Sequence, residues 1–223
     1  MKSALLFDLD GTLVDSDADH LRAFQRVFGE LGIDVDKQAY ATRIHGAENA
    51  EIGRWFLPSL TPEQRAATLD AKEASYREHL GAPEPIAGVV ALLDFAAANG
   101  IGYAVVTNAP RANVDAVLGA LGLGARLPLR VVGGEVERAK PDPLPYLTAL
   151  RRLGAEADRS LAFEDSLSGV RSALGAGLAV VGLTTTLAAA TLIRAGAVFA
   201  VADFTDPRIA ALIERRTSPG EKA

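Results

Sequence analysis

Short apolar runs alternate with helical stretches after about residue 85, and this alternation limits the possible folds more than any other feature. With residues 4–7, the apolar runs are 102–106, 129–132, 160–163 and 179–183. The helical stretches are 88–99, 111–121, 143–153 and 166–175. Strands that are apolar on both sides need cover on both faces, and intervening helices supply it when the strands are parallel. The sequence therefore predicts an α/β fold with a doubly wound parallel sheet.

Residues 16–84 have a different pattern, without a convincing strand. Leu21, Phe24, Phe28 and Leu31 repeat at helical spacing. The aromatic residues of this segment are expected to form its core; they are Phe24, Phe28, Trp55 and Phe56. Glycine and prolines at 81–85 mark a linker back to the sheet. We predict an α/β core domain of residues 1–15 and 85–223, and an inserted α-helical domain of residues 16–84.

The composition excludes several kinds of function. The chain of 223 residues contains no cysteine, which rules out disulfides, thiol catalysis and thiolate metal sites. Its net charge is −5 and it has no basic run, so neither nucleic acid nor an anionic membrane is an expected partner. No uninterrupted apolar segment reaches the roughly 18 residues that a membrane-spanning helix needs. We expect a cytoplasmic monomer that binds a small molecule.

Polar residues follow the predicted strands at the points where those strands end. They are Asp8 and Asp10, Thr107 and Asn108, and Glu164 and Asp165, with Lys140 in a separate loop before a helix. Ligands of an open α/β sheet bind beyond the carboxyl ends of its strands, so these side chains should share one rim. Four carboxylates at one rim repel one another unless a cation lies between them. Because only oxygen ligands are on offer, Mg²⁺ is the expected ion.

This set of residues favours phosphoryl transfer, because Mg²⁺ usually completes its coordination with a substrate phosphate. An aspartate can attack phosphorus and form an aspartyl-phosphate. Asp8 lies nearest the strand and is the expected nucleophile, whereas Asp10 is the expected acid and base. Lys140 can neutralise a phosphate, and Thr107 and Asn108 are placed to bind its oxygens.

In their order along the chain, these residues resemble the four motifs of the haloacid dehalogenase (HAD) superfamily. The motifs are Asp8-Leu-Asp10-Gly11-Thr12, Thr107-Asn108, Lys140-Pro141 and Glu164-Asp165. The resemblance implies that Mg²⁺ is held by the Asp8 side chain, the Asp10 backbone carbonyl and Asp165. It implies that Glu164 is a further ligand or a neighbour of the ligands, and that Thr107 and Lys140 hold the transferring phosphate. It also implies that the inserted helices form a small cap.

Finer features resemble the sugar-phosphate phosphatases of broad specificity within this superfamily. That resemblance implies Mg²⁺-dependent hydrolysis of small sugar or polyol phosphate monoesters through an aspartyl-phosphate. It assigns substrate choice to the cap, where His20, His45 and Asn49 are the candidate contacts. A phosphoglycolate phosphatase is an alternative within the same chemistry.

A β-phosphoglucomutase is the main alternative, since these mutases share the four motifs and a histidine that matches His20. They carry a cap arginine that grips a second phosphate, and Asn49 stands in its place here. Loss of a guanidinium weakens the mutase interpretation, although Arg43 or Arg54 could substitute. A non-enzymatic phospho-acceptor module, as in response-regulator receivers, is a third possibility; receivers are shorter and lack a helical insertion.

Overall fold

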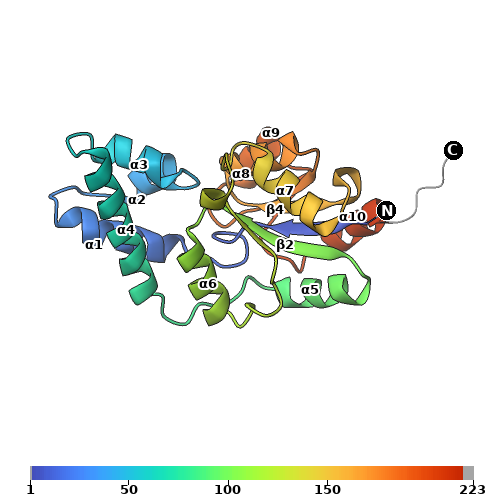
Figure 1. The fold of residues 1–223 in the computed structure, drawn as a ribbon. Coiled ribbons are helices and arrows are strands. Elements are labelled where there is room, and N and C mark those ends of the chain that lie inside the picture. Colours follow the sequence, from blue (N-terminus) through green and yellow to red (C-terminus); the bar gives the residue numbers. More distant parts are fainter. Residues whose placement is uncertain (1, 218–223) are drawn as a thin grey trace.

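A parallel β-sheet forms the centre of the protein, whose computed structural model describes residues 2–217 (Figure 1). The sheet has six strands in the order β3-β2-β1-β4-β5-β6, and every neighbouring pair is parallel. The strands are β1 (Ala4–Phe7), β2 (Gly102–Thr107), β3 (Arg130–Val132), β4 (Leu161–Glu164), β5 (Ala179–Leu183) and β6 (Phe199–Val201). The predicted α/β class is confirmed, and β6 is an edge strand that the sequence did not reveal.

Two layers of helices cover the sheet because successive strand residues point to opposite faces. Leu5 and Phe7 belong to one buried cluster, and Ala4 and Leu6 belong to the other. The first cluster is covered by α5 (Val89–Ala98), α6 (Arg111–Ala120) and α10 (Pro207–Thr217). The second is covered by α7 (Leu144–Leu153), α8 (Leu167–Gly175) and α9 (Ala189–Ala195).

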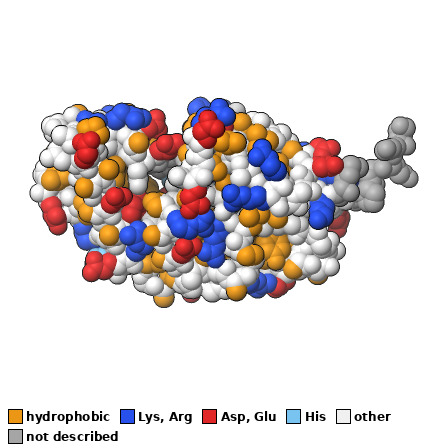
Figure 2. Space-filling model, viewed as in Figure 1, with side chains coloured by type: hydrophobic (Ala, Val, Ile, Leu, Met, Phe, Trp, Pro, Cys, Tyr) orange, Lys and Arg blue, Asp and Glu red, His pale blue; other side chains and the backbone are white. Residues whose placement is uncertain are grey.

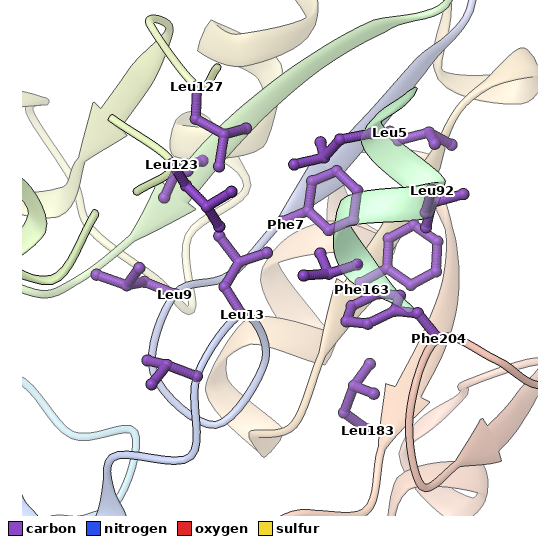
Figure 3. Close-up of a cluster of buried hydrophobic side chains, with 14 of the residues drawn as sticks. Leu5, Phe7, Leu9, Leu13, Leu92, Leu123, Leu127, Phe163, Leu183 and Phe204 are labelled. Carbon is purple, nitrogen blue, oxygen red and sulfur yellow. The ribbon is translucent and has the colours of Figure 1, made fainter. Parts of the chain in front are cut away.

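Three phenylalanines fix the ends of the two central strands (Figure 3). Phe7 and Phe163 stack with ring centroids 5.0 Å apart, and Phe204 packs edge-on at 5.8 Å from Phe7. Burial of each ring contributes roughly 1.5–3 kcal/mol. Phe7 immediately precedes Asp8, and Phe163 immediately precedes Glu164. The apolar core therefore fixes the strand residues that directly precede the two acidic motifs.

A helical insertion, defined here as Asp17–Glu78, separates β1 from the rest of the sheet. It contains α1 (Asp17–Gly29), α2 (Lys37–Ala39), a π-helical turn (Tyr40–Ile44), α3 (Asn49–Phe56) and α4 (Pro62–Glu78). It has its own buried cluster, which includes Phe24, Phe28 and Tyr40. In Figure 1 these helices lie at the end of the molecule away from the chain's N-terminus. The division at residues 15/16 and 84/85 stays a prediction.

Two residues predicted on the buried side of these helices are exposed instead. Trp55 is 50% exposed and Leu31 is 49% exposed. Each residue of a helix is turned by about 100° from the one before, so Trp55 points away from the face on which Phe56 packs. Leu31 lies beyond the end of α1 at Gly29, where helical spacing no longer applies. Within residues 2–217, no helix is both long enough and apolar enough to span a bilayer.

Candidate active site

The candidate site lies at the carboxyl ends of the central strands. β1 lies between β2 and β4, and the chain changes direction of travel along the sheet at this point, which is where α/β sheets form a crevice. Asp8 follows β1, Thr107 ends β2, and Glu164 ends β4. These three positions explain why residues far apart in the sequence meet.

A cavity of about 120 Å³ brings most of the predicted residues together between the sheet and the helical insertion. Figure 2 shows the notch between these two parts of the molecule. The predicted residues that line the cavity are Asp8, Asp10, Thr107, Asn108, Lys140 and Asp165 from the sheet side, and His20, His45 and Asn49 from the insertion. Glu164 is fully buried behind the wall.

Lys140 lies between two carboxylates. Its Nζ is 2.7 Å from Asp8 Oδ1 and 2.5 Å from Glu164 Oε1. The Tyr146 hydroxyl donates to the same Glu164 oxygen at 2.7 Å. Burial lowers the pKa of Lys140, but the two carboxylates outweigh burial and raise it. A positively charged ammonium therefore lies beside the predicted nucleophile.

One cation is not enough for the carboxylates that gather here. Oxygens of Asp8, Glu164 and Asp165 lie within 4.8 Å of one another. Burial raises the pKa of Asp8 well above its usual range, and the two carboxylates add to the shift although Lys140 opposes it. Asp165 Oδ1 is buried without a hydrogen-bond partner. A divalent cation would supply that partner and lower these pKa values, so the cluster fits a metal that prefers oxygen ligands.

Two glycines make room for these carboxylates. Gly11 has a φ of +72°, and a Cβ there would overlap the Asp165 carboxylate. Gly169 lies in the first turn of α8, where its backbone N–H donates to Ser166 Oγ at 3.0 Å. A Cβ on Gly169 would overlap the Glu164 carboxylate. The backbone therefore approaches both acidic side chains closely.

Gly169→Ala should lower the free energy of unfolding by about 1–3 kcal/mol, because Glu164 is held by Lys140 and Tyr146 and cannot move aside freely. Urea unfolding measures this change. Gly119→Ala is the matched control, since a Cβ at that helical glycine of α6 meets nothing within 4 Å. Equal stability of the Gly169 variant and wild type would contradict the packing described for Glu164.

Two side chains hold Asp10, one from Ser16 directly before α1 and one from His20 within α1. Ser16 Oγ donates to Asp10 Oδ1 at 2.6 Å, and His20 Nε2 lies 3.3 Å from the same oxygen. Lys72 Nζ lies 2.9 Å from His20 Nδ1, so Nδ1 accepts and the proton of a neutral imidazole is on Nε2. Burial raises the pKa of Asp10, but the His20 and Ser16 hydrogen bonds outweigh it and lower the pKa.

His45 bridges the helical insertion and the acidic cluster. Its Nδ1 lies 3.3 Å from Asp17 Oδ1, and its Nε2 lies 3.3 Å from Asp165 Oδ2. Burial lowers the pKa of His45, but the two carboxylates raise it overall to about 10. Asp17 also accepts a hydrogen bond from Thr186 Oγ1 at 2.6 Å. His45 is therefore an imidazolium that links a core motif to the insertion.

Asn108 has a structural task that the sequence did not suggest. Its side-chain nitrogen donates to the Lys140 carbonyl at 3.0 Å, and its side-chain oxygen accepts from the Lys140 N–H at 3.1 Å. These two bonds hold the loop that carries Lys140. Thr107 Oγ1 accepts from the Ala109 N–H at 3.0 Å. The predicted phosphate contacts of Thr107 and Asn108 stay predictions. Because the Asn108 side chain is bonded to Lys140 at both ends, Asn108 would contact a phosphate through its backbone N–H.

Sequence reasoning missed a buried polar group in the cavity wall. Glu73 Oε2 accepts from Lys72 Nζ at 3.1 Å and from Asn113 Nδ2 at 2.7 Å, while Oε1 accepts from Asn49 Nδ2 at 3.0 Å. Lys72 and Glu73 are 2% and 5% exposed. Leu69, Lys72, Glu73 and Tyr76 have the spacing of one buried helical face. That spacing could have indicated that Lys72 and Glu73 are buried, although charged residues at the centre of a helical face are more typical of a solvated surface.

Comparisons with known proteins agree with this geometry. The model of the haloacid dehalogenase-like hydrolase family matches residues 5–183. The chain is 38% identical to protein CbbY of Rhodobacter capsulatus over 189 residues, which cover 80% of this chain and 83% of that protein. It is 32% identical to validoxylamine A 7'-phosphate phosphatase of Streptomyces hygroscopicus subsp. limoneus over 197 residues, covering 87% and 92% of the two.

A solved structure supports the same assignment. The crystal structure of CbbY from Rhodobacter sphaeroides in complex with xylulose-(1,5)bisphosphate superposes with a TM-score of 0.81 at 30% sequence identity. The match covers 92% of this chain and 96% of that one. The family model spans the positions of all four motifs. The chain therefore belongs to the haloacid dehalogenase-like hydrolase family.

Proposed function

We propose that the protein is a Mg²⁺-dependent phosphatase that hydrolyses small sugar or polyol phosphate monoesters through an aspartyl-phosphate. The observation that carries the proposal is Lys140, which bridges Asp8 and Glu164 next to the unpartnered Asp165 Oδ1. A nucleophile, a fixed cation and an oxygen-rich metal site thus share one cavity. The names of related phosphatases support the same chemistry, including the 6-phosphogluconate phosphatase of Escherichia coli, which is 30% identical.

In the proposed reaction, Asp8 attacks phosphorus while Asp10 donates a proton to the departing alkoxide oxygen. Water then attacks the phosphorus of the aspartyl-phosphate, and Asp10 takes up the proton of that water. Lys140 balances the charge that develops on the phosphoryl oxygens. Asp8, Asp165 and the Asp10 backbone carbonyl would hold Mg²⁺, with Glu164 in direct or close contact. When bound, the metal supplies charge neutralisation and orients the phosphate.

The helical insertion acts in this proposal as a cap that closes over the substrate. Its contribution to the cavity wall includes His20, His45 and Asn49. Closure excludes bulk water while Asp8 attacks and brings His20 against Asp10. The proposed boundaries of this cap are residues 16 and 84, and the protein is proposed to act as a cytoplasmic monomer.

Removal of Mg²⁺ should abolish phosphate release, and its return should restore it. The test is a panel of sugar, glycerol, glycolate and nucleotide monophosphates assayed after chelation and again with Mg²⁺ added. Sugar and polyol phosphates should be hydrolysed fastest, and thermal stability should rise with Mg²⁺ because the metal relieves repulsion among buried carboxylates. Equal activity with and without Mg²⁺, at equal stability, would overturn the metal site.

The mutase alternative is weaker because, among residues 2–217, no guanidinium lines the cavity to bind a second phosphate. Asn49 lies in the wall and is bonded to Glu73. Arg54 pairs with Glu51 on an exposed surface, and Arg43 is also exposed. β-Glucose 1-phosphate with a trace of its bisphosphate separates the two activities, since a phosphatase releases phosphate and a mutase yields glucose 6-phosphate.

His20→Phe should move the acidic limb of the kcat profile to higher pH. The variant keeps a ring to stack on Tyr76, where the His20 ring lies 3.9 Å away, but it removes the donor to Asp10. Loss of that hydrogen bond raises the pKa of Asp10, so a larger fraction of Asp10 is protonated at a given pH. Protonated Asp10 cannot take the proton of the water that attacks the aspartyl-phosphate, so this step slows at low pH. His79→Phe, at an exposed position directly after the end of α4, is the control. A limb that stays in place or moves to lower pH contradicts this role of His20.

A further inference from the structure

In the described part of the chain, the positively charged side chains in the wall formed by the helical insertion are Lys72 and His45, and both are matched by carboxylates. Lys72 lies 3.1 Å from Glu73 Oε2, and His45 lies between Asp17 and Asp165. The neutral His20 imidazole contacts Asp10 and adds no cation to this wall. Among residues 2–217, no arginine lines the cavity. This wall therefore presents no cation without a counter-charge to a bound substrate.

Glu73 is fixed in this wall from both parts of the protein. Lys72 and Asn49 bind it from the insertion, and Asn113 of α6 binds it from the sheet domain. Both ends of the Asn113 amide are hydrogen-bonded, since its nitrogen donates to Glu73 and its oxygen accepts from Arg77 Nη1 at 2.7 Å. Asn113 is 1% exposed. Glu73 cannot turn away from Lys72 without breaking these bonds.

We propose that Glu73 is a specificity-determining residue that restricts the enzyme to monophosphates whose leaving group is uncharged. It does so by neutralising Lys72, the one lysine that the insertion contributes to the cavity wall within the described residues. The inference rests on the proposed phosphatase activity and names the chemical class of its substrate. Substrates with a second phosphate or a carboxylate are excluded.

The reason is the cost of burying an anion without a partner. A second anionic group that enters this cavity loses its hydration and meets a lysine whose charge is already balanced. Neutral hydroxyl groups avoid this cost, and they can donate to the carboxylates of Glu73 and Asp17 in the same wall. The related CbbY of Rhodobacter sphaeroides was crystallised with a bisphosphate, and the Escherichia coli relative is named for 6-phosphogluconate, which carries a carboxylate. This protein is expected to differ from both in this respect.

Matched substrate pairs test the proposal in the wild-type protein. Glucose 6-phosphate is compared with 6-phosphogluconate, and glucose 1-phosphate with glucose 1,6-bisphosphate, at saturating Mg²⁺. We expect kcat/KM to be at least about tenfold higher for the neutral member of each pair. Equal or higher values for the anionic members would overturn the proposal. If neither these four compounds nor the panel of monophosphates described above releases phosphate, the proposed function itself fails, which is a different result.

Glu73→Gln then tests whether this residue sets the preference. The amide oxygen can still accept from Lys72 and Asn113, and the amide nitrogen can donate to Asn49 if the Asn49 amide turns over. The substitution leaves the Lys72 ammonium without its adjacent counter-charge, and an incoming anion would take the place of the lost carboxylate. We expect the preference for neutral substrates to fall about tenfold, through a gain on the anionic substrates. Glu78→Gln, exposed on the same helix, should leave the preference unchanged. An unaltered preference in a folded Glu73 variant would overturn the role of Glu73. The wild-type ratios remain decisive should that variant fail to fold.

Discussion

Asp8→Asn should lower the turnover of phosphate monoesters by at least about 10⁴-fold, because an amide cannot replace the carboxylate that is proposed to attack phosphorus. The asparagine has the shape of aspartate, and Lys140 keeps Glu164 as its partner. The fold should therefore be retained, and thermal stability should not fall because one buried carboxylate is removed from an acidic cluster. Steady-state phosphate release and thermal unfolding measure the two effects.

Asp15→Asn is the matched control for this variant. Asp15 is exposed and lies close to Asp8 in the sequence, so the same chemical change should leave turnover within about twofold of wild type. Substantial turnover by the Asp8 variant would refute the nucleophile. A collapse of stability in that variant would show instead that Asp8 has a mainly structural role.

Lys140→Met should be the most destabilising of the substitutions considered, by about 3–5 kcal/mol at neutral pH, and should also abolish turnover. It leaves Asp8 and Glu164 buried beside each other without their cation. Urea unfolding at several pH values measures the effect. The control is Lys37→Met, which changes an exposed lysine of the insertion.

The destabilisation should depend on pH with a definite sign. Burial already raises the pKa of Asp8 in the folded protein, and loss of Lys140 raises it further. Over the pH range between the pKa of Asp8 in the unfolded chain and its higher pKa in the folded variant, the folded variant binds a proton that the unfolded chain has released. The free energy of unfolding of the variant therefore falls as pH rises through this range. The deficit relative to wild type should be smaller near pH 5 than near pH 8. A small deficit that does not change with pH would contradict the charge balance described for this site.

The acidic motifs could be predicted because they follow from the topology. Once a parallel sheet is recognised, residues after each strand must meet at one rim, and this placed Asp8, Glu164 and Asp165 together. The topology predicts where a residue lies but not whether its side chain points toward a substrate. Asn108 shows the difference, since its position was right but its amide binds the Lys140 loop.

The polar wall of the insertion could not be predicted, because burial of charge depends on partners that are distant in the sequence. Lys72 and Glu73 occupy the middle of a helical face that otherwise contains Leu69 and Tyr76. Charged residues are normally solvated, so their burial is explained by their own ion pair and by contacts with His20, Asn49 and Asn113. β6 was also missed, although it is as long as β3, the other edge strand, which was predicted.

The most direct test of the central claim is a search for phosphate on Asp8 during turnover. Enzyme mixed with excess ³²P-labelled sugar phosphate and Mg²⁺ is quenched in acid within the first turnover, digested, and its labelled peptide sequenced. The label should lie on the peptide that contains Asp8, should be released by hydroxylamine as expected of an acyl phosphate, and should be missing from Asp8→Asn. Label on another residue, or turnover with no labelled protein at any time point, would contradict the mechanism proposed for this site.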